Sequence, residues 1–277
     1  MSGRRYAWIH GFGVAILVLY SGCTTVPLTQ TESIQAGIWE LDEELLYRYW
    51  AMAEAAWRVQ IQFRDAPWEL DYFGNEETAT LAVAIEYENA YHIAFRATHD
   101  QRGSPDQLLN LRAVPRRPKY LDPDTSFRAH SGYLQRYESV RQELLTRVFA
   151  HRGNTIILIG ASAGGALATL AFDEVRRLAP DIDVRLITYS SPRVLTSSTQ
   201  RVLQDQEYRA VRVVYAQDIV PALPPAILGY RHFGAHVQLG EPRRLVSLSV
   251  RDHHPRTREA LRDLLSEAGV DRSDLGY

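Results

Sequence analysis

The sequence of 277 residues has one cysteine, Cys23, so no disulfide can join two parts of the same chain. It also has one lysine, Lys119, and its net charge of −2 gives no basic surface of the kind that binds nucleic acid. Long apolar runs are missing as well. The apolar stretch over residues 6–20 is interrupted by His10 and is too short for a good membrane span. The sequence therefore gives no indication of a disulfide-rich scaffold or of a nucleic-acid-binding protein.

The rest of the composition is that of an ordinary globular protein, with 45% hydrophobic and 23% charged residues. A chain of this length can bury one substantial hydrophobic core. It shows no internal repeat and no sign of a second domain. We therefore expect a signal peptide over residues 1–22, a polar tether over 23–37 and a single α/β domain over 38–277.

The first residues have the features of a secretory signal peptide. Arg4 and Arg5 precede the apolar stretch, which ends shortly before Cys23. The residues around this cysteine resemble the cleavage and lipidation site of bacterial lipoproteins, although Tyr20 stands where leucine is usual. We expect acyl chains on Cys23 to anchor the protein. By the same resemblance, Thr24 favours the periplasmic face of the outer membrane. The alternatives are an uncleaved anchor, or a plain signal peptide and a secreted protein.

Apolar spacing predicts the order of the helices and strands. Helices are expected over 38–57 and 131–149, and strands over 78–87 and 90–97 joined by the hairpin signal Glu88–Asn89. An alternation of strand and helix follows, at 155–159, 164–177, 184–189, 196–205 and 210–215. Further short strands are expected at 59–63, 236–239 and 244–250, and a last helix at 255–268. This order predicts an α/β fold with a mostly parallel central sheet and helices on both faces.

Ser162 lies in the segment Gly160–Gly164, between the apolar run at 155–159 and a run of helix-forming residues. A serine with glycine two residues away on either side, between a buried strand and a helix, is the sequence form of a nucleophile elbow. Such a turn presents the hydroxyl at a helix N-terminus, which favours negative charge. We therefore predict that Ser162 is a catalytic nucleophile. A glycine-rich strand-to-helix turn without a catalytic role is the alternative.

A nucleophilic serine needs a base, and the base needs an acid that orients it. In α/β-hydrolases these follow the serine in the order Asp, His, each after a strand. Asp218 comes just after the strand expected at 210–215, and His253 and His254 lie at the start of the last helix. The oxyanion needs two backbone N–H groups. We expect one from Ala163 and the other from the end of the strand at 90–97.

Several further segments accompany these candidate residues in a fixed order along the chain. Together they are Ala94–Thr98, Asp106–Leu111, Ala129–Tyr133, Thr188–Arg193, Gln217–Pro225 and Asp252–His253. Taken in order, these motifs resemble those of the class 3 lipases, the fungal-lipase-like branch of the α/β-hydrolases. The resemblance implies an α/β-hydrolase fold, with an oxyanion donor at Thr98, the acid at Asp218 and the base at His253. It leaves His254 as the alternative base and implies no cofactor.

The irregular stretch at 99–126 begins at the predicted oxyanion donor and is long for a connection within a compact domain. In the resembling family, this segment covers the site as a lid. A lid here would bury an apolar face against the site, and a surface loop fixed by its prolines is the alternative. The residues expected on the buried face are Leu108, Leu109, Leu111 and Val114.

We therefore expect a lipid-anchored serine hydrolase that cleaves carboxylic esters, with triacylglycerols or phospholipids as substrates. The alternatives are a short-chain esterase, or an envelope lipoprotein that binds lipid or a partner without turnover. His232 and His236 have the spacing of a helical metal pair, but Gly234 between them argues against a helix. We expect no metal, no nucleic acid and no protein partner.

Overall fold

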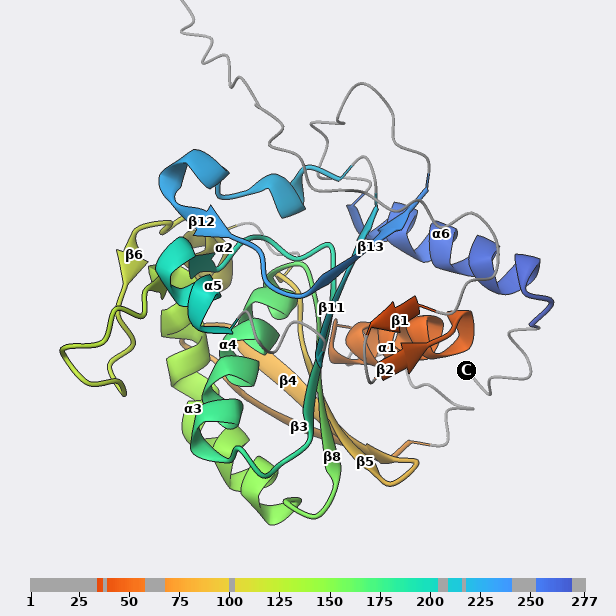
Figure 1. The fold of residues 1–277 in the computed structure, drawn as a ribbon, viewed down its shortest axis with the longest axis horizontal. Helices are drawn as coiled ribbons and strands as arrows, with labels where there is room; N and C mark the ends of the chain where they lie inside the picture. The colour runs from red at the N-terminus through yellow and green to blue at the C-terminus, as the bar shows by residue number, and fades with distance from the viewer. Residues whose placement is uncertain are drawn as a thin grey trace, which may run out of the picture.

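A computed structural model describes residues 34–36, 39–57, 68–99, 103–203, 209–215, 218–240 and 253–270. In these residues, a central β-sheet lies between two layers of helices (Figure 1). None of the described helices combines the length and the apolar character needed to cross a membrane. The expected signal peptide, Cys23 and the short strands expected at 59–63 and 244–250 lie outside the described residues.

The central sheet contains seven strands in the order β13-β11-β9-β8-β5-β4-β3. From β5 to β13 neighbouring strands are parallel, whereas β4 pairs antiparallel with β5 and with β3. The carboxyl ends of the parallel strands therefore share one edge, where sheets of this kind carry their binding sites. The strands are β3 (Leu70–Asn75), β4 (Thr80–Tyr87), β5 (Ala90–Phe95), β8 (Thr155–Ala161), β9 (Val184–Tyr189), β11 (Ala210–Tyr215) and β13 (Ala235–Leu239).

Helices cover both faces of this sheet (Figure 1). Side chains of α3 (Ser131–Ala150) and α4 (Ala163–Leu178) form one buried cluster with the sheet. Side chains of α1 (Glu43–Trp57) and α6 (His253–Glu267) form the cluster on the other face. The layered arrangement is therefore the one that the strand–helix alternation predicts.

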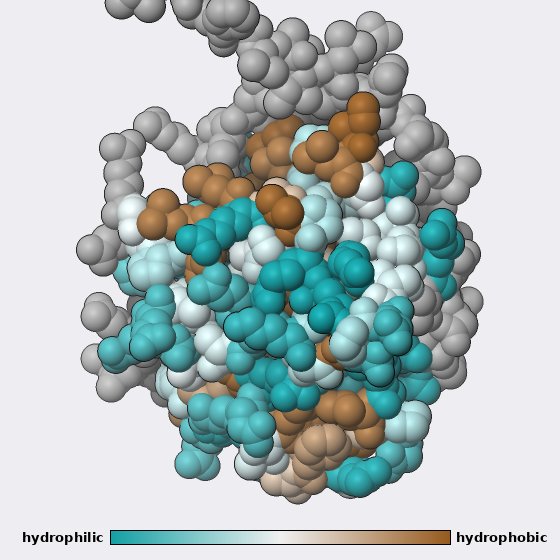
Figure 2. Space-filling view, turned by 90° about the vertical axis from the view of Figure 1, so that its left-hand side faces the viewer, coloured by the Kyte–Doolittle hydropathy of each residue, from teal (hydrophilic) through white to brown (hydrophobic). Residues whose placement is uncertain are grey.

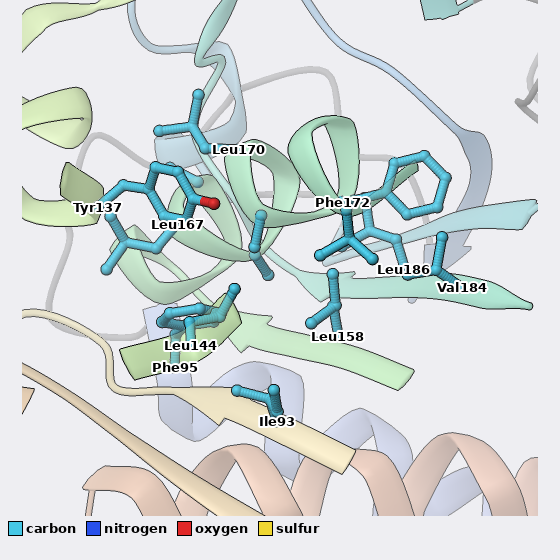
Figure 3. Close-up of a cluster of buried hydrophobic side chains, with 14 of the residues drawn as sticks. Ile93, Phe95, Tyr137, Leu144, Leu158, Leu167, Leu170, Phe172, Val184 and Leu186 are labelled. Carbon is cyan, nitrogen blue, oxygen red and sulfur yellow. The ribbon is translucent and has the colours of Figure 1, made fainter. Parts of the chain in front are cut away.

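β8 shows why the strands are apolar at nearly every position. A parallel strand covered by helices on both faces must bury the side chains that point to either side. Ile156 and Leu158 belong to the cluster beneath α3 and α4, whereas Ile157 and Ile159 belong to the cluster beneath α1 and α6. Figure 3 shows the first cluster, with Leu158 beneath side chains of α4. This burial fixes the position at which β8 ends and α4 begins.

A second sheet of four short strands lies beside α2 (Pro105–Asn110) and the start of α3 (Figure 1). In this second sheet, β6 and β7 belong to the segment that follows β5, and β12 belongs to the segment that follows β11, so the sheet connects the two segments. The Tyr230 hydroxyl adds to this connection by donating to the Ala113 carbonyl at 2.8 Å. The elements of this region are β6 (Pro115–Arg116), β7 (Ala129–His130), β10 (Leu195–Thr196), α5 (Ser197–Leu203), β12 (Tyr230–Arg231) and the 3-10 helices η2 (Val220–Ala222) and η3 (Ala226–Leu228).

The expected helix over 38–57 is wrong at its start. Residues Trp39–Leu41 form β2, which pairs antiparallel with β1 (Ile34–Ala36) at the end of the expected tether. α1 begins at Glu43, because the Asp42 carboxylate accepts from the Leu45 N–H at 2.8 Å and so caps the helix. β1 therefore lies within the range 23–37 that is expected for the tether.

Further elements were not expected from the sequence, among them α2, β6 and β3. The stretch at 99–126 contains α2 and β6, and α2 starts with a proline at its first turn, where the missing N–H costs nothing. β3 was also missed, because its sequence mixes exposed and buried positions without strict alternation. The hairpin signal is confirmed, since Glu88 and Asn89 have φ values of 48° and 59°, both in the left-handed region.

Candidate active site

Ser162 occupies the turn between β8 and α4, as the sequence predicts. Its φ of 51° and ψ of −127° lie outside the conformations that L-residues usually adopt. The Ser162 N–H donates to the Tyr189 carbonyl at 2.8 Å, which holds the turn against the end of β9. Gly164 cannot carry a side chain, because a Cβ there would lie 2.2 Å from the Phe95 carbonyl oxygen. The turn therefore has the strained geometry of a nucleophile elbow.

Asp218 and His253 contact each other at the carboxyl edge of the sheet. His253 Nδ1 donates to Asp218 Oδ2, and both side chains are almost completely buried. The other carboxylate oxygen of Asp218 accepts from the Val220 N–H at 2.9 Å, which fixes the carboxylate. His253 Nε2 is buried and has no hydrogen-bond partner among the described residues. An imidazole held through Nδ1 in this way presents Nε2 as a proton acceptor.

Contacts around α6 bring His253 to the end of the sheet where Ser162 lies. Thr257, one turn after His253, donates to the His253 carbonyl at 3.0 Å and lies 3.3 Å from the Ser190 hydroxyl. Ser190 directly follows Tyr189, whose carbonyl accepts from the Ser162 N–H. Ser162, Ser190 and His253 therefore belong to one connected group of residues at the ends of β8 and β9.

His254 lies in a different environment from His253. Its ring centre is 4.7 Å from that of Trp57 and 5.9 Å from that of Trp50, both in α1. Loss of solvation, together with the neighbouring His253 and Arg258, lowers the pKa of His254 to about 3. His254 is therefore neutral at neutral pH and joins α6 to α1 by ring packing, whereas His253 holds the contact with Asp218.

The two predicted oxyanion donors lie at the ends of neighbouring strands. Phe95 of β5 is paired with Gly160 of β8, so the chain that continues to Thr98 runs beside the elbow. Ala163 is the first residue of α4, where the first N–H groups of a helix have no partner within it. The Thr98 hydroxyl oxygen accepts from Asn110 Nδ2 at 2.9 Å. The fold therefore brings the chain that leads to Thr98 beside the turn that contains Ser162 and Ala163.

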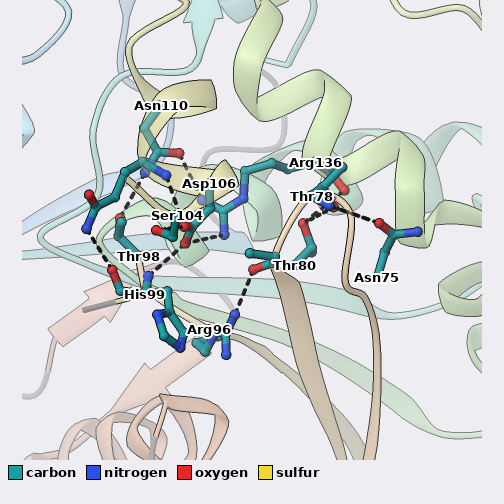
Figure 4. Close-up of polar contacts among 12 residues, drawn as sticks. Asn75, Thr78, Thr80, Arg96, Thr98, His99, Ser104, Asp106, Asn110 and Arg136 are labelled. Carbon is teal, nitrogen blue, oxygen red and sulfur yellow. Dashed lines mark hydrogen bonds and ion pairs between the residues drawn. The ribbon is translucent and has the colours of Figure 1, made fainter. Parts of the chain in front are cut away.

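Sequence reasoning missed the polar network that holds Thr98 from behind (Figure 4). Asp106 and Asn110 of α2 contact Arg136 of α3, and the Asp106 and Arg136 side chains are fully buried. Burial lowers the pKa of Arg136 to about 10, which leaves the guanidinium charged at neutral pH. One signal was visible in the sequence: Arg136 lies four residues before Val140, on the buried face of α3, where arginine is unusual.

The sequence predicts that four apolar side chains of a lid are buried, and this prediction is wrong for three of them. Leu109 is buried, but Leu108, Leu111 and Val114 are 57%, 80% and 70% exposed. Within α2 the polar side chains of Asp106 and Asn110 contact the chain around Thr98, so Leu108 faces outward; Leu111 and Val114 follow the end of α2.

The described residues contain no group of three or more His, Cys, Asp or Glu side chains that could hold a metal ion. His236 lies in β13, so it does not share a helix with His232. The ring of His232 is hydrogen-bonded through Nε2 to the Pro221 carbonyl at 2.7 Å. Neither histidine has the helical arrangement that a metal pair of this spacing requires.

The sheet order, the strained serine turn and the strand-end position of Asp218 define an α/β-hydrolase fold. Within that class, residues 92–228 match the family model described as Lipase (class 3), and the fold is that of the class 3 lipases. The match begins in β5 and ends in η3, so it includes Thr98, Ser162 and Asp218 but not His253.

Individual relatives are fungal lipases. The chain is 35% identical over 107 residues to Secreted mono- and diacylglycerol lipase 1 of Fusarium solani, covering 37% of this chain and 32% of that protein. It is 32% identical over 170 residues to a lipase of Rhizopus niveus, covering 57% of this chain and 41% of that protein. The chain therefore spans less than half the length of these curated relatives.

Solved structures show the same fold. The triacylglyceride lipase of Rhizomucor miehei superposes with a TM-score of 0.61 at 22% identity, over 72% of this chain and 80% of that chain. Lipase II of Rhizopus niveus gives a TM-score of 0.58 at 21% identity, over 71% of this chain and 80% of that chain.

Proposed function

We propose that this protein is a serine hydrolase that cleaves carboxylic esters of lipids. The observation that carries the proposal is the buried pair of His253 and Asp218, in which Nε2 is left without a partner among the described residues. This pair lies at the same end of the sheet as the strained turn of Ser162. The match of residues 92–228 to the class 3 lipases supports the same reaction.

The proposed reaction uses the three side chains in turn. Ser162 Oγ attacks the ester carbonyl carbon while His253 Nε2 takes the hydroxyl proton, and Asp218 stabilises the imidazolium. The carbonyl oxygen becomes an oxyanion, which the N–H groups of Thr98 and Ala163 stabilise. His253 then donates its proton to the leaving oxygen, which releases the alcohol and leaves an acyl-enzyme. Water attacks the acyl group with His253 again as the base, and the acid leaves without help from a cofactor.

An exposed apolar surface supports a lipid as the substrate. Of the eight large apolar side chains that are exposed in the described residues, six lie within residues 108–114 and 223–228. These two segments follow Thr98 and Asp218 in the chain, and the Tyr230–Ala113 hydrogen bond connects the regions that contain them. We call this group the rim surface: Leu108, Leu111, Val114, Leu223, Ile227 and Leu228.

Figure 2 shows apolar side chains gathered at the upper part of the molecular face that it presents, and others near the lower end of the same face. A concentration of exposed apolar side chains on a soluble domain marks a surface that contacts another apolar phase. The rim surface therefore favours esters in a lipid aggregate over short soluble esters. The names of the relatives, which include mono- and diacylglycerol lipase, agree with this substrate class.

We also propose that the chain is exported and held at the membrane by acyl chains on Cys23. The support comes from the basic and apolar character of the first residues and from the position of the one cysteine. Export fits the secreted relative from Fusarium solani. A lipid anchor would hold the domain close to an ester substrate that is itself in a membrane.

A soluble fluorophosphonate with a fluorescent group tests the proposed nucleophile, because it forms a stable bond only with an activated serine. We expect one label on Ser162 in the wild-type protein and none in Ser162→Ala, with unchanged circular dichroism. A panel of triacylglycerols, phospholipids and short esters then identifies the substrate class. A folded wild-type protein that takes no label would reject the enzyme and favour a lipid-binding lipoprotein. Preference for short soluble esters would favour a short-chain esterase.

A further inference from the structure

A fully buried charge pair lies behind the chain that carries Thr98 (Figure 4). Arg136 Nη2 is 3.8 Å from Asp106 Oδ2, and neither side chain has any exposed surface. We call residues 96–99 the oxyanion segment. Resting on the function proposed above, we propose that Arg136 is a positioning residue, which holds the oxyanion segment and α2 in the geometry that stabilises the oxyanion.

The first connection runs through Asp106 to the backbone. Asp106 Oδ2 accepts from the His99 N–H at 2.7 Å, and Oδ1 accepts from the Ser104 hydroxyl at 2.5 Å and the Gln107 N–H at 3.0 Å. The Gln107 side chain donates to the His99 carbonyl at 2.9 Å. The peptide groups on both sides of His99 are therefore fixed to α2. Because a buried carboxylate needs a compensating charge, Arg136 helps Asp106 to hold this position, together with Arg96, whose guanidinium also interacts with the Asp106 charge.

The second connection runs through Asn110 to the Thr98 hydroxyl. Arg136 Nη1 donates to Asn110 Oδ1 at 2.9 Å, and a guanidinium can only donate. The amide of Asn110 is thereby oriented with Nδ2 toward Thr98, where it donates to Oγ1 at 2.9 Å. Since the Thr98 oxygen already accepts this bond, its hydroxyl hydrogen is available for another acceptor, such as the oxyanion. Arg136 thus sets the direction of the hydrogen bonds that end at the site.

Close backbone contact makes α2 and the start of α3 a single unit. A Cβ on Gly132 would lie 1.7 Å from the Leu109 carbonyl oxygen, so α2 packs against α3 at a distance that only glycine allows. The Ser131 hydroxyl donates to the Arg112 carbonyl at 2.7 Å, just beyond the end of α2. Since α3 is buried along one face, the oxyanion segment is attached through α2 to the core of the domain.

The test compares Arg136→Met with a matched control, Arg141→Met. Arg141 also lies in α3 and pairs with a buried carboxylate, Glu174, at 2.6 Å, but this pair joins α3 to α4 and does not contact the oxyanion segment. We expect Arg136→Met to lower kcat for a soluble short-chain ester by about 10–100-fold with little change in KM, because it disturbs oxyanion stabilisation. The control should keep the wild-type kcat. Arg136→Lys keeps the positive charge, but a single ammonium group cannot face both Asn110 and Asp106 as the two nitrogens of the guanidinium do. This variant should therefore lower kcat by less than Arg136→Met does.

Hydrogen exchange separates this proposal from the proposed function, because it needs no turnover. Amides of residues 96–99 and 103–111 should exchange faster in Arg136→Met than in the wild type or in Arg141→Met. If Arg136→Met does not fold, the double variant Arg136→Met with Asp106→Asn takes its place in each comparison. This double variant removes both buried charges, so neither is left without a partner. Wild-type kcat and wild-type exchange in a folded variant would overturn the positioning role. A wild-type protein that neither takes the fluorophosphonate nor cleaves esters would overturn the proposed function, while the exchange comparison would still decide the role of Arg136.

Discussion

At the scale of single residues, two adjacent histidines at the start of α6 have separate environments. His253 contacts Asp218, whereas His254 packs against Trp50 and Trp57. We predict that His253→Ala lowers kcat by about 10⁴-fold or more, as loss of a triad base does elsewhere. His254→Phe should stay close to the wild type, because a phenyl ring can keep the packing against α1. Turnover of a soluble ester measures both variants, and the opposite pattern would place the base one residue later.

Buried histidines also make the folded state sensitive to acid. Desolvation lowers the pKa of His92 and His130 to about 4 and that of His254 to about 3, against about 6.5 in an unfolded chain. Between the pKa of a histidine in the unfolded chain and its lower pKa in the folded protein, the unfolded chain binds more protons than the folded protein. The contribution of these histidines to the free energy of unfolding is therefore complete above about pH 6.5, and it is lost as the pH falls toward their pKa values in the folded protein. We predict that the free energy of unfolding in urea decreases from pH 6.5 to about 4.

His254→Phe provides the control for this prediction, because it removes one of the groups that take up a proton on unfolding. Its free energy of unfolding should fall less steeply over the same pH range than that of the wild type. Equal slopes for the two proteins would show that the depressed pKa of His254 does not contribute.

Some residues of the candidate site could be predicted from the sequence, and others could not. Ser162 was visible because glycines flank it between a strand and a helix, and Asp218 because it follows an apolar strand. His253 and His254 could not be separated from sequence, since the choice depends on which ring α6 turns toward Asp218. Arg136 was missed because its partners come from a helix about 30 residues earlier, and only the folded chain brings them together.

At the scale of elements, the buried parallel strands were the most predictable part of the fold. β9 and β11 have the expected bounds, because each is an apolar run between turns. The start of α1 was wrong because apolar residues with helical spacing continue into β2, and only the Asp42 cap marks the boundary. α2 was missed because a helix of six residues has too few turns to show a period.

α2 is held in place by contacts with the oxyanion segment and with α3, which limits its movement away from the site. Asp106 and Asn110 attach it to the oxyanion segment, and Leu109 is in close contact with Gly132. We predict that α2 does not have to open for a small reagent to reach Ser162. The rate of labelling by a soluble fluorophosphonate should be the same with and without lipid vesicles. A steep rise in this rate when vesicles are added would show that α2 acts as a lid after all.

At the scale of the whole molecule, the predicted acyl anchor and the domain should be separable. We predict that the wild-type protein requires detergent for extraction from membranes and carries an acyl mass on Cys23. Cys23→Ser should lack this mass and change its extraction behaviour, while its turnover of a soluble ester stays at the wild-type value. Mass spectrometry and fractionation measure these properties. A wild-type protein found in the soluble fraction without acyl mass would contradict the anchor.

The rim surface gives a second way for the molecule to contact lipid, and it can be measured once the anchor is removed. In a Cys23→Ser background, the pair Leu111→Glu and Ile227→Glu changes two exposed members of the rim surface, whereas Phe149→Glu and Leu178→Glu change exposed apolar residues at the far ends of α3 and α4. Burying one large apolar side chain contributes about 1.5–3 kcal/mol, so the rim pair should weaken binding to phospholipid vesicles by about tenfold or more.

The control pair should bind vesicles like its parent. Both pairs should cleave a soluble short ester at the parent rate, because all four changed side chains are exposed and none is a candidate catalytic residue. Sedimentation with vesicles measures the binding. Equal weakening by the two pairs would mean that apolar exposure in general drives the association. Weakening by the rim pair alone would place the lipid surface over the edge of the sheet where Ser162 and His253 lie.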